Sequence, residues 1–119
     1  MMNDTVTALA DFVFVGHKNQ YERVAKTDII ALTASGAYVD ILTVGNKQYR
    51  VSTYLANVLE QLNDPNFVRI SRKQVVNLFH IELVNHDTVF IGSQNFTVTQ
   101  SYRQEFMDSL PILRTGKKG

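Results

Sequence analysis

Short strand-like segments separated by turn residues recur along this chain, and this pattern constrains the fold more than any other feature. In residues 37–44, Val39 and Ile41 share one face of the expected strand, while Tyr38 and Asp40 share the other. Comparable segments are bounded by Gly, Asn, Asp and Ser, which favour turns. The expected strands are residues 12–15, 21–24, 27–34, 37–44, 48–52, 67–70, 79–84, 88–91 and 95–99.

The first of these segments, Phe12 to Val15, is entirely apolar and is therefore expected to be a buried strand. A helical period replaces the strand period in the middle of the chain. There Leu55, Val58 and Leu62 belong to the stripe of an amphipathic helix, expected over residues 53–62. The Asn-Asp-Pro sequence that follows is expected to end this helix.

Two Ser-x-x-Gln segments have the spacing of a helix capping box. Ser71–Gln74 is expected to begin a single helical turn, and Ser101–Gln104 is expected to begin a terminal helix that carries Phe106 and ends at Pro111. Strands and helices do not alternate along the chain as they do in parallel sheets. The sequence therefore predicts a mainly β protein, with antiparallel sheets and two short helices.

The composition is that of one globular domain. A chain of 119 residues can bury one core but not two independent ones, and 45% hydrophobic with 19% charged residues is ordinary. No apolar run is long enough to cross a bilayer, and the N-terminal sequence lacks the pattern of a secretory signal. There is no cysteine, which fits a reducing compartment, so we expect a cytoplasmic protein.

The net charge of +1 is a weak indication of nucleic-acid binding. Cations nevertheless gather in two places. Arg69, Arg72 and Lys73 lie in a stretch without acidic residues, and a second cluster lies in the C-terminal tail, residues 112–119. Charge alone is more typical of a solvated surface than of a DNA-binding site.

Catalytic and metal-binding motifs are missing from the sequence. His80 and His86 are six residues apart, with no cysteine and no nearby carboxylate to complete a ligand set. No glycine-rich nucleotide-binding loop, zinc-protease motif or nucleophile elbow occurs. We therefore expect no enzyme activity and no cofactor.

The stretch from Phe67 to Ile81 resembles the signature of the LytTR (LytR/AgrA-type) DNA-binding domain, F-x-R-x-H-R-S-x-x-V-N-x-x-H-I. Residues 34–39 and 97–106 also resemble segments of that family, in the same order, so the resemblance covers about residues 12–110. The positions that match the signature are Phe67, Arg69, Arg72, Val76, Asn77, His80 and Ile81.

The resemblance implies an elongated fold of small antiparallel sheets over residues 12–111, between a flexible N-terminus, 1–11, and a basic tail, 112–119. It implies a bacterial transcription regulator of the response-regulator class, part of a two-component system. Its partner would be double-stranded promoter DNA, with loops of the domain in successive major grooves of tandem repeats. No membrane and no small-molecule substrate is implied. We expect a monomer in solution that pairs on tandem sites.

The resemblance also implies which residues meet DNA. Arg72 is expected to donate two hydrogen bonds to a guanine. Lys73 and Arg69 are expected to neutralise phosphates, although Arg69 is equally consistent with a stem packed along the sheet. Ser101 and Arg103 are expected to meet phosphates at the start of the terminal helix, where Ser101 is also suited to be an N-cap.

The remaining DNA-reading loop contains Ser35 and Ala37, and here the chain departs from the family. Ala37 replaces a polar residue, so Ser35 is the alternative source of a base contact. Ser71 stands where the family has histidine, and Gln100–Ser101 stand where it often has arginines. These changes remove positive charge, so we expect modest affinity per domain.

Two matching residues, Asn77 and His80, are expected to be structural, because amides and imidazoles in turns usually bond backbone groups. Two other functions are open at this point. The near-neutral charge also fits a β-rich protein-interaction module that has lost DNA binding, and it would show an exposed apolar patch. A small enzyme would show a concave pocket with perturbed titratable groups.

Overall fold

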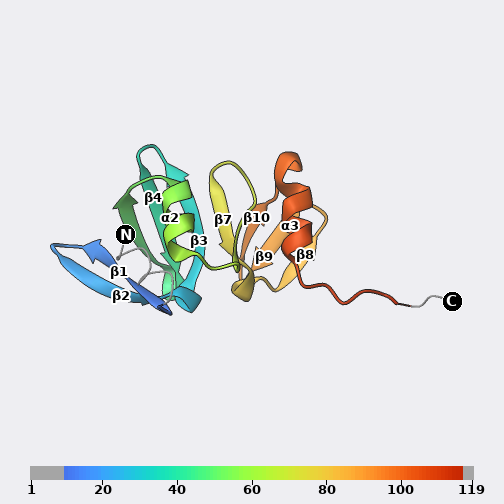
Figure 1. The fold of residues 1–119 in the computed structure, drawn as a ribbon, viewed down its shortest axis with the longest axis horizontal. Coiled ribbons are helices and arrows are strands. Elements are labelled where there is room, and N and C mark those ends of the chain that lie inside the picture. Colours follow the sequence, from blue (N-terminus) through green and yellow to red (C-terminus); the bar gives the residue numbers. More distant parts are fainter. Residues whose placement is uncertain (1–9, 117–119) are drawn as a thin grey trace.

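A central antiparallel sheet organises the computed structural model, which describes residues 10–116 (Figure 1). Its five strands have the order β5-β4-β3-β7-β6, flanked by the two-stranded β1–β2 sheet and the three-stranded β10-β9-β8 sheet. The molecule is elongated, with extents of 60 × 28 × 26 Å. The strands are β1 (Phe12–His17), β2 (Gln20–Ala25), β3 (Ile29–Ser35), β4 (Tyr38–Thr43), β5 (Lys47–Ser52), β6 (Phe67–Arg69), β7 (Gln74–Asn77), β8 (Leu83–Asn85), β9 (Thr88–Ile91) and β10 (Gln94–Thr97).

Strands β3 and β7 are buried on both faces, because neighbouring residues point to opposite sides of the sheet. Leu32 lies opposite Val75, and Ala31 lies opposite Val76. All four are buried, but Leu32 and Val75 belong to one hydrophobic cluster whereas Ala31 and Val76 belong to another. The central sheet therefore separates two cores.

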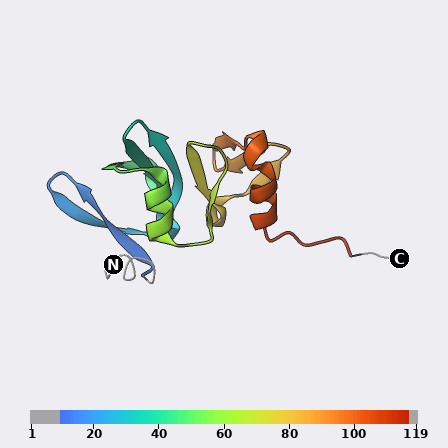
Figure 2. The ribbon, with the colours of Figure 1, turned by 45° about the horizontal axis from the view of Figure 1, so that its top comes forward.

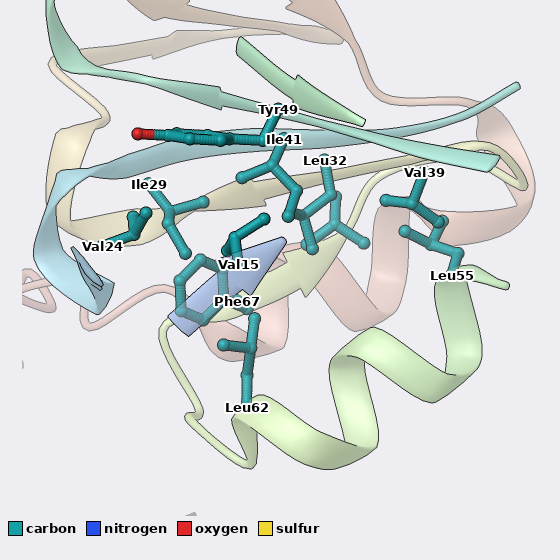
Figure 3. Close-up of a cluster of buried hydrophobic side chains, with 11 residues drawn as sticks. Val15, Val24, Ile29, Leu32, Val39, Ile41, Tyr49, Leu55, Leu62 and Phe67 are labelled. Atoms are coloured by element: carbon teal, nitrogen blue, oxygen red, sulfur yellow. The ribbon is translucent and has the colours of Figure 1, made fainter. Parts of the chain in front are cut away.

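The first core lies under helix α2 (Leu55–Leu62) and the β1–β2 hairpin (Figure 3). The helix begins after Tyr54 without a side-chain cap, and it ends at Asn63, whose φ of 44° is left-handed. The Lys26 ammonium donates a 3.0 Å hydrogen bond to the Leu62 carbonyl. A cation at this end of a helix is favourable. The buried side chains are Val15, Val24, Ile29, Leu32, Val39, Ile41, Tyr49, Leu55, Leu62, Phe67 and Val75.

The second core lies between the central sheet, the β8–β10 sheet and helix α3 (Arg103–Ser109) (Figure 2). Phe106 of α3 is fully buried at its centre. The other buried members of this core are Ala31, Ile70, Val76, Val89, Ile91 and Val98.

Four short 3₁₀ turns complete the described chain. They are Lys26–Asp28, Val44–Asn46, Leu78–His80 and Gln100–Tyr102. The strands and the two short helices together confirm the expected mainly β fold.

Some local expectations are wrong. Residues 79–84 do not form one strand, because Leu78–His80 is a 3₁₀ turn and β8 begins only at Leu83. Ser71–Gln74 forms no helical turn, because these residues make the hairpin turn between β6 and β7. The Ser71 hydroxyl still accepts from the Gln74 amide at 3.1 Å, as in a capping box. The strand from Phe12 to Val15 is not buried throughout: Val15 is buried, but Phe14 is 61% exposed. The expected flexible N-terminus, 1–11, lies outside the described residues except for its last two positions.

Candidate nucleic-acid interface

Two of the three turns expected to meet DNA are joined directly through the central sheet. The turn between β3 and β4 lies beside the turn between β6 and β7, because β3 and β7 are paired neighbours. Thr33 lies opposite Gln74, and the Ala34 amide donates a 2.8 Å hydrogen bond to the Lys73 carbonyl. The sheet therefore fixes the distance between the two turns.

The third segment is fastened to the second by the carbonyl of Ile70. This oxygen accepts from the Thr99 amide at 2.9 Å and from the Thr99 hydroxyl at 3.4 Å. Thr99 immediately precedes the 3₁₀ turn Gln100–Tyr102, which leads into α3. Both views show the β3–β4 turn, the β6–β7 turn and the start of α3 on the same long edge of the molecule, uppermost in Figures 1 and 2. We call this the turn edge.

The β3–β4 turn is a two-residue loop, since Ser35 pairs with Tyr38. Its first loop residue, Gly36, has a φ of 61°, where glycine is favoured because it lacks a Cβ. Ala37 is exposed and Ser35 is half-buried. The loop thus presents a methyl group and one hydroxyl at the turn edge.

The β6–β7 turn holds its backbone rigidly and leaves its cations free. Both Ile70 and Ser71 donate their amides to the Gln74 carbonyl, at 3.0 and 3.4 Å. Arg72 and Lys73 are exposed, and neither side chain makes a hydrogen bond or ion pair within residues 10–116. An unpaired guanidinium on a fixed turn can bind an acceptor without first breaking an ion pair.

At the third segment the structure separates the two expected residues. Ser101 is exposed in the 3₁₀ turn, but it does not cap α3, which begins after Tyr102 without a side-chain cap. Arg103 is half-buried, and its Nη1 donates to the His86 carbonyl in the β8–β9 turn. Ser101 is therefore available at the turn edge, while Arg103 is engaged in holding another turn.

Arg69 lies on β6, just before the second turn, and it is half-buried. It lines a shallow hollow together with Glu105 and Asp108 of α3. Its Nε is buried and has no hydrogen-bond partner within the described residues. This placement favours the alternative in which the Arg69 stem packs along the sheet.

Asn77 and His80 lie at the end of the β3–β7 pair away from the turn edge, and their expected structural role is confirmed. The buried Asn77 amide donates to the Ile29 carbonyl at 2.8 Å, and its oxygen accepts from the Phe79 amide at 3.0 Å. His80 Nε2 lies 2.6 Å from the Thr27 carbonyl. Both residues therefore fasten the end of β7 to the start of β3.

One further cation lies near the turn edge but is already paired. Arg50 on β5 binds both carboxylate oxygens of Asp40, at 2.7 and 3.0 Å, and stacks 5.1 Å from the Tyr38 ring centre. Its hydrogen bonds lower the pKa of Asp40. Tyr38 packs against Arg50 while remaining 44% exposed.

Comparison with known families identifies the domain. A family model described as the LytTr DNA-binding domain matches residues 19–110, about three quarters of the chain. The chain belongs to the LytTr DNA-binding domain family. DNA binding and regulation of transcription, as in response regulators, are thereby its class of function.

A solved structure agrees with this LytTr fold. It is the LytTr DNA-binding domain of a putative methyl-accepting/DNA response regulator from Bacillus cereus. The similarity has a TM-score of 0.72 at 20% sequence identity, and covers 87% of this chain and 99% of that one. A comparison with curated proteins finds no match. Within the described residues, no helix is long and apolar enough to cross a membrane, and no group of three or more His, Asp or Glu is placed to hold a metal ion.

No pattern in the sequence indicates the residues that hold the LytTr turn edge together. Thr99 contacts Ile70 across 29 positions of the chain. Ala34 and Lys73 are joined by backbone atoms, so side-chain identity carries little information about their contact. The link between Ala34 and Lys73 follows from the pairing of β3 with β7, and residues 75–77 of β7 were not among the expected strands.

Proposed function

We propose that this LytTr domain places its turn edge along a DNA duplex, with the β3–β4 turn, the β6–β7 turn and the start of α3 entering successive major grooves of tandem promoter repeats. The observation that carries the proposal is that all three turns lie on one edge and are tied together by hydrogen bonds. A single duplex can touch them together, which would be impossible if they faced different sides.

Arg72 reads the sequence in this proposal. Its guanidinium is free and exposed at the tip of a rigid turn, and it can donate two hydrogen bonds to guanine O6 and N7. Lys73 is beside it and neutralises a phosphate. Ser101 donates its hydroxyl to a backbone phosphate at the third turn, and Arg103 assists it by holding the neighbouring His86 turn in place.

Of the three turns, the β3–β4 turn contributes least to DNA binding in this proposal. Ala37 offers only its methyl group, which suits the C5-methyl group of thymine, and Ser35 is half-buried. Few charges therefore meet the DNA from one copy, so binding of one copy is modest. Residues 12–111 act as a monomeric DNA-binding unit, and occupancy comes from two copies on tandem sites.

Selection of binding sequences from random duplexes tests the proposal. The parent should enrich a site with guanine at a fixed position, and Arg72→Ala should lose about 1–3 kcal/mol of discrimination at that position alone. Arg23→Ala is the matched control, because Arg23 is also exposed but lies on the β1–β2 hairpin. An unchanged preference after Arg72→Ala would remove that residue from the reading site, and a parent without any preference would overturn the proposal.

A further inference from the structure

We infer that the C-terminal segment of one copy, Ile112–Arg114, docks on the outer face of the β1–β2 hairpin of the next copy along the DNA. This inference rests on the proposed binding to tandem repeats. It assigns a protein-contact surface to each end of the elongated domain, apart from the turn edge.

The hairpin carries an aromatic face that nothing covers within the described residues. Phe12, Phe14 and Tyr21 are 39, 61 and 78% exposed. Phe12 and Phe14 are two apart on β1, and their rings meet edge to face at 5.9 Å. Arg23 lies opposite Phe14 and is stacked 5.6 Å from the Phe12 ring centre. A contiguous patch of exposed apolar side chains marks a protein-contact surface, whereas single exposed apolar residues are ordinary.

A groove borders this face on the side toward α2, and it is lined largely by residues of the first core, such as Val15 and Leu32. It has a volume of about 400 Å³ and runs between the hairpin and the helix. Phe14 and Tyr21 lie at its hairpin side, and Val58 and Gln61 lie at its helix side. The groove can therefore accept an aliphatic side chain beside the exposed rings.

The opposite end of the molecule offers a matching segment. After α3 the chain continues in a non-helical conformation and carries Leu113, which is 95% exposed, and Ile112, which is 43% exposed. Figure 1 shows this segment leaving the end of the molecule away from the hairpin. Three residues beyond Leu110 reach at most about 10 Å, whereas the molecule is 60 Å long. The segment therefore meets a hairpin of another copy, not its own.

Tandem repeats bring these two surfaces together. The three turns are spread along the long axis of the molecule in Figure 1, so the duplex runs along that axis in the proposed complex. Repeats in the same direction place copies end to end, with the C-terminal end of one beside the hairpin of the next. A hairpin-to-hairpin contact would instead need a two-fold axis, which belongs to inverted repeats.

Charge favours the same pairing. Arg114 follows the exposed Leu113, and it is exposed itself. At the base of the hairpin, a second hollow beside Phe12 is lined by three carboxylates and two cations, so acidic groups are in excess there. They are Asp11, Asp28, Asp64, Arg23 and the buried Lys26. A cation next to the docked leucine would thus meet carboxylates next to the aromatic face.

Binding of the full chain to duplexes with one or two repeats tests this inference. We expect the parent to fill the second repeat about tenfold more tightly than the first, because one buried leucine side chain supplies roughly that factor. Leu113→Asp and Phe14→Asp should each abolish this factor and leave the affinity for one repeat unchanged. Inserting about 5 bp between the repeats should abolish it as well, because half a helical turn places the copies on opposite sides of the duplex.

The controls separate this inference from the proposed function. Leu83→Asp removes a leucine that is 53% exposed on β8 and belongs to neither surface, so it should leave the tenfold factor intact. The inference is overturned if Leu113→Asp weakens binding to a single repeat equally, or if only Phe14→Asp removes the factor. Failure of the parent to bind even one repeat would instead count against the proposed function.

Discussion

The amide of Ala34 donates a 2.8 Å hydrogen bond to the carbonyl of Lys73, and this bond joins two turns that are 39 positions apart in sequence. Because both atoms belong to the backbone of a paired sheet, the spacing between Ala37 and Arg72 does not depend on loop flexibility. In the proposed complex, this preorganised turn edge would lose little entropy on binding.

The salt dependence of binding should separate Lys73 from Arg69. We expect Lys73→Gln to weaken binding to all sequences alike and to reduce the slope of log affinity against log salt by about one, because one phosphate contact is lost. Arg69→Met keeps an apolar stem of similar length where the Arg69 Nε is buried without a partner, so the slope should stay the same. Fluorescence-anisotropy titrations at several salt concentrations measure both, and equal slopes for parent and Lys73→Gln would remove Lys73 from the contact.

The stability of the central sheet should depend on Asn77. Its amide group makes hydrogen bonds to Ile29 and Phe79 in a site that is 2% exposed. Asn77→Ala should lower the free energy of unfolding by about 3 kcal/mol, since the side-chain hydrogen bonds are lost and buried backbone groups are left unpaired. Asn95→Ala, at an exposed position on β10, should change it by less than about 0.5 kcal/mol. Urea denaturation measures the difference, and equal losses would contradict the structural role of Asn77.

The strands and helices were predictable where the spacing of hydrophobic residues in the sequence matches the residues that are buried in the fold. Alternation placed Val39 and Ile41 inside, and both are buried in the first core. The stripe of Leu55 and Leu62 gave α2, which begins two residues later than expected because Tyr54 is still extended. Phe14 failed this rule, since only the face of the β1–β2 sheet that carries Val15 packs on the core, and Phe14 lies on the other face.

The residues proposed to face DNA were predictable only in part. The resemblance to LytTr domains indicated Arg72 and Lys73, and the structure leaves both side chains exposed on a fixed turn. The capping-box spacing of Ser71 was misleading, because the same hydrogen bond to Gln74 also closes a hairpin turn. The contact from Arg103 to His86 depends on how two distant turns pack, which no local pattern encodes.

Acid should weaken the attachment of the β1–β2 hairpin to β5. One oxygen of Glu22 accepts from the Lys47 ammonium and from the Tyr49 hydroxyl, each at 2.8 Å, and both bonds lower the Glu22 pKa below its ordinary 4.5. A depressed carboxyl pKa stabilises the fold above the unfolded-state pKa, and this stabilisation is lost as the pH falls through the folded-state value.

Glu22→Gln should therefore flatten the loss of stability between about pH 5 and pH 3. Glu60→Gln is the matched control, because Glu60 is exposed on α2 and makes no hydrogen bond or ion pair within the described chain. Thermal unfolding at a series of pH values measures the effect. Asp40 also has a lowered pKa, but it is present in both variants, so its effect on acid stability cancels in the comparison. If the parent and Glu22→Gln lost stability to the same extent as the pH falls, this role of Glu22 would be contradicted.

The second core should stabilise the start of α3 at the turn edge. It should not affect which bases of the DNA are recognised. Phe106 is fully buried between α3 and the sheets, so Phe106→Ala should cost about 3–5 kcal/mol of unfolding free energy. Phe79→Ala removes the same ring from a site that is 65% exposed and should cost far less. At temperatures where Phe106→Ala remains folded, its affinity should fall by the unfolded fraction alone, while its preference for guanine opposite Arg72 persists. A changed base preference would show that α3 packing shapes the reading turn directly.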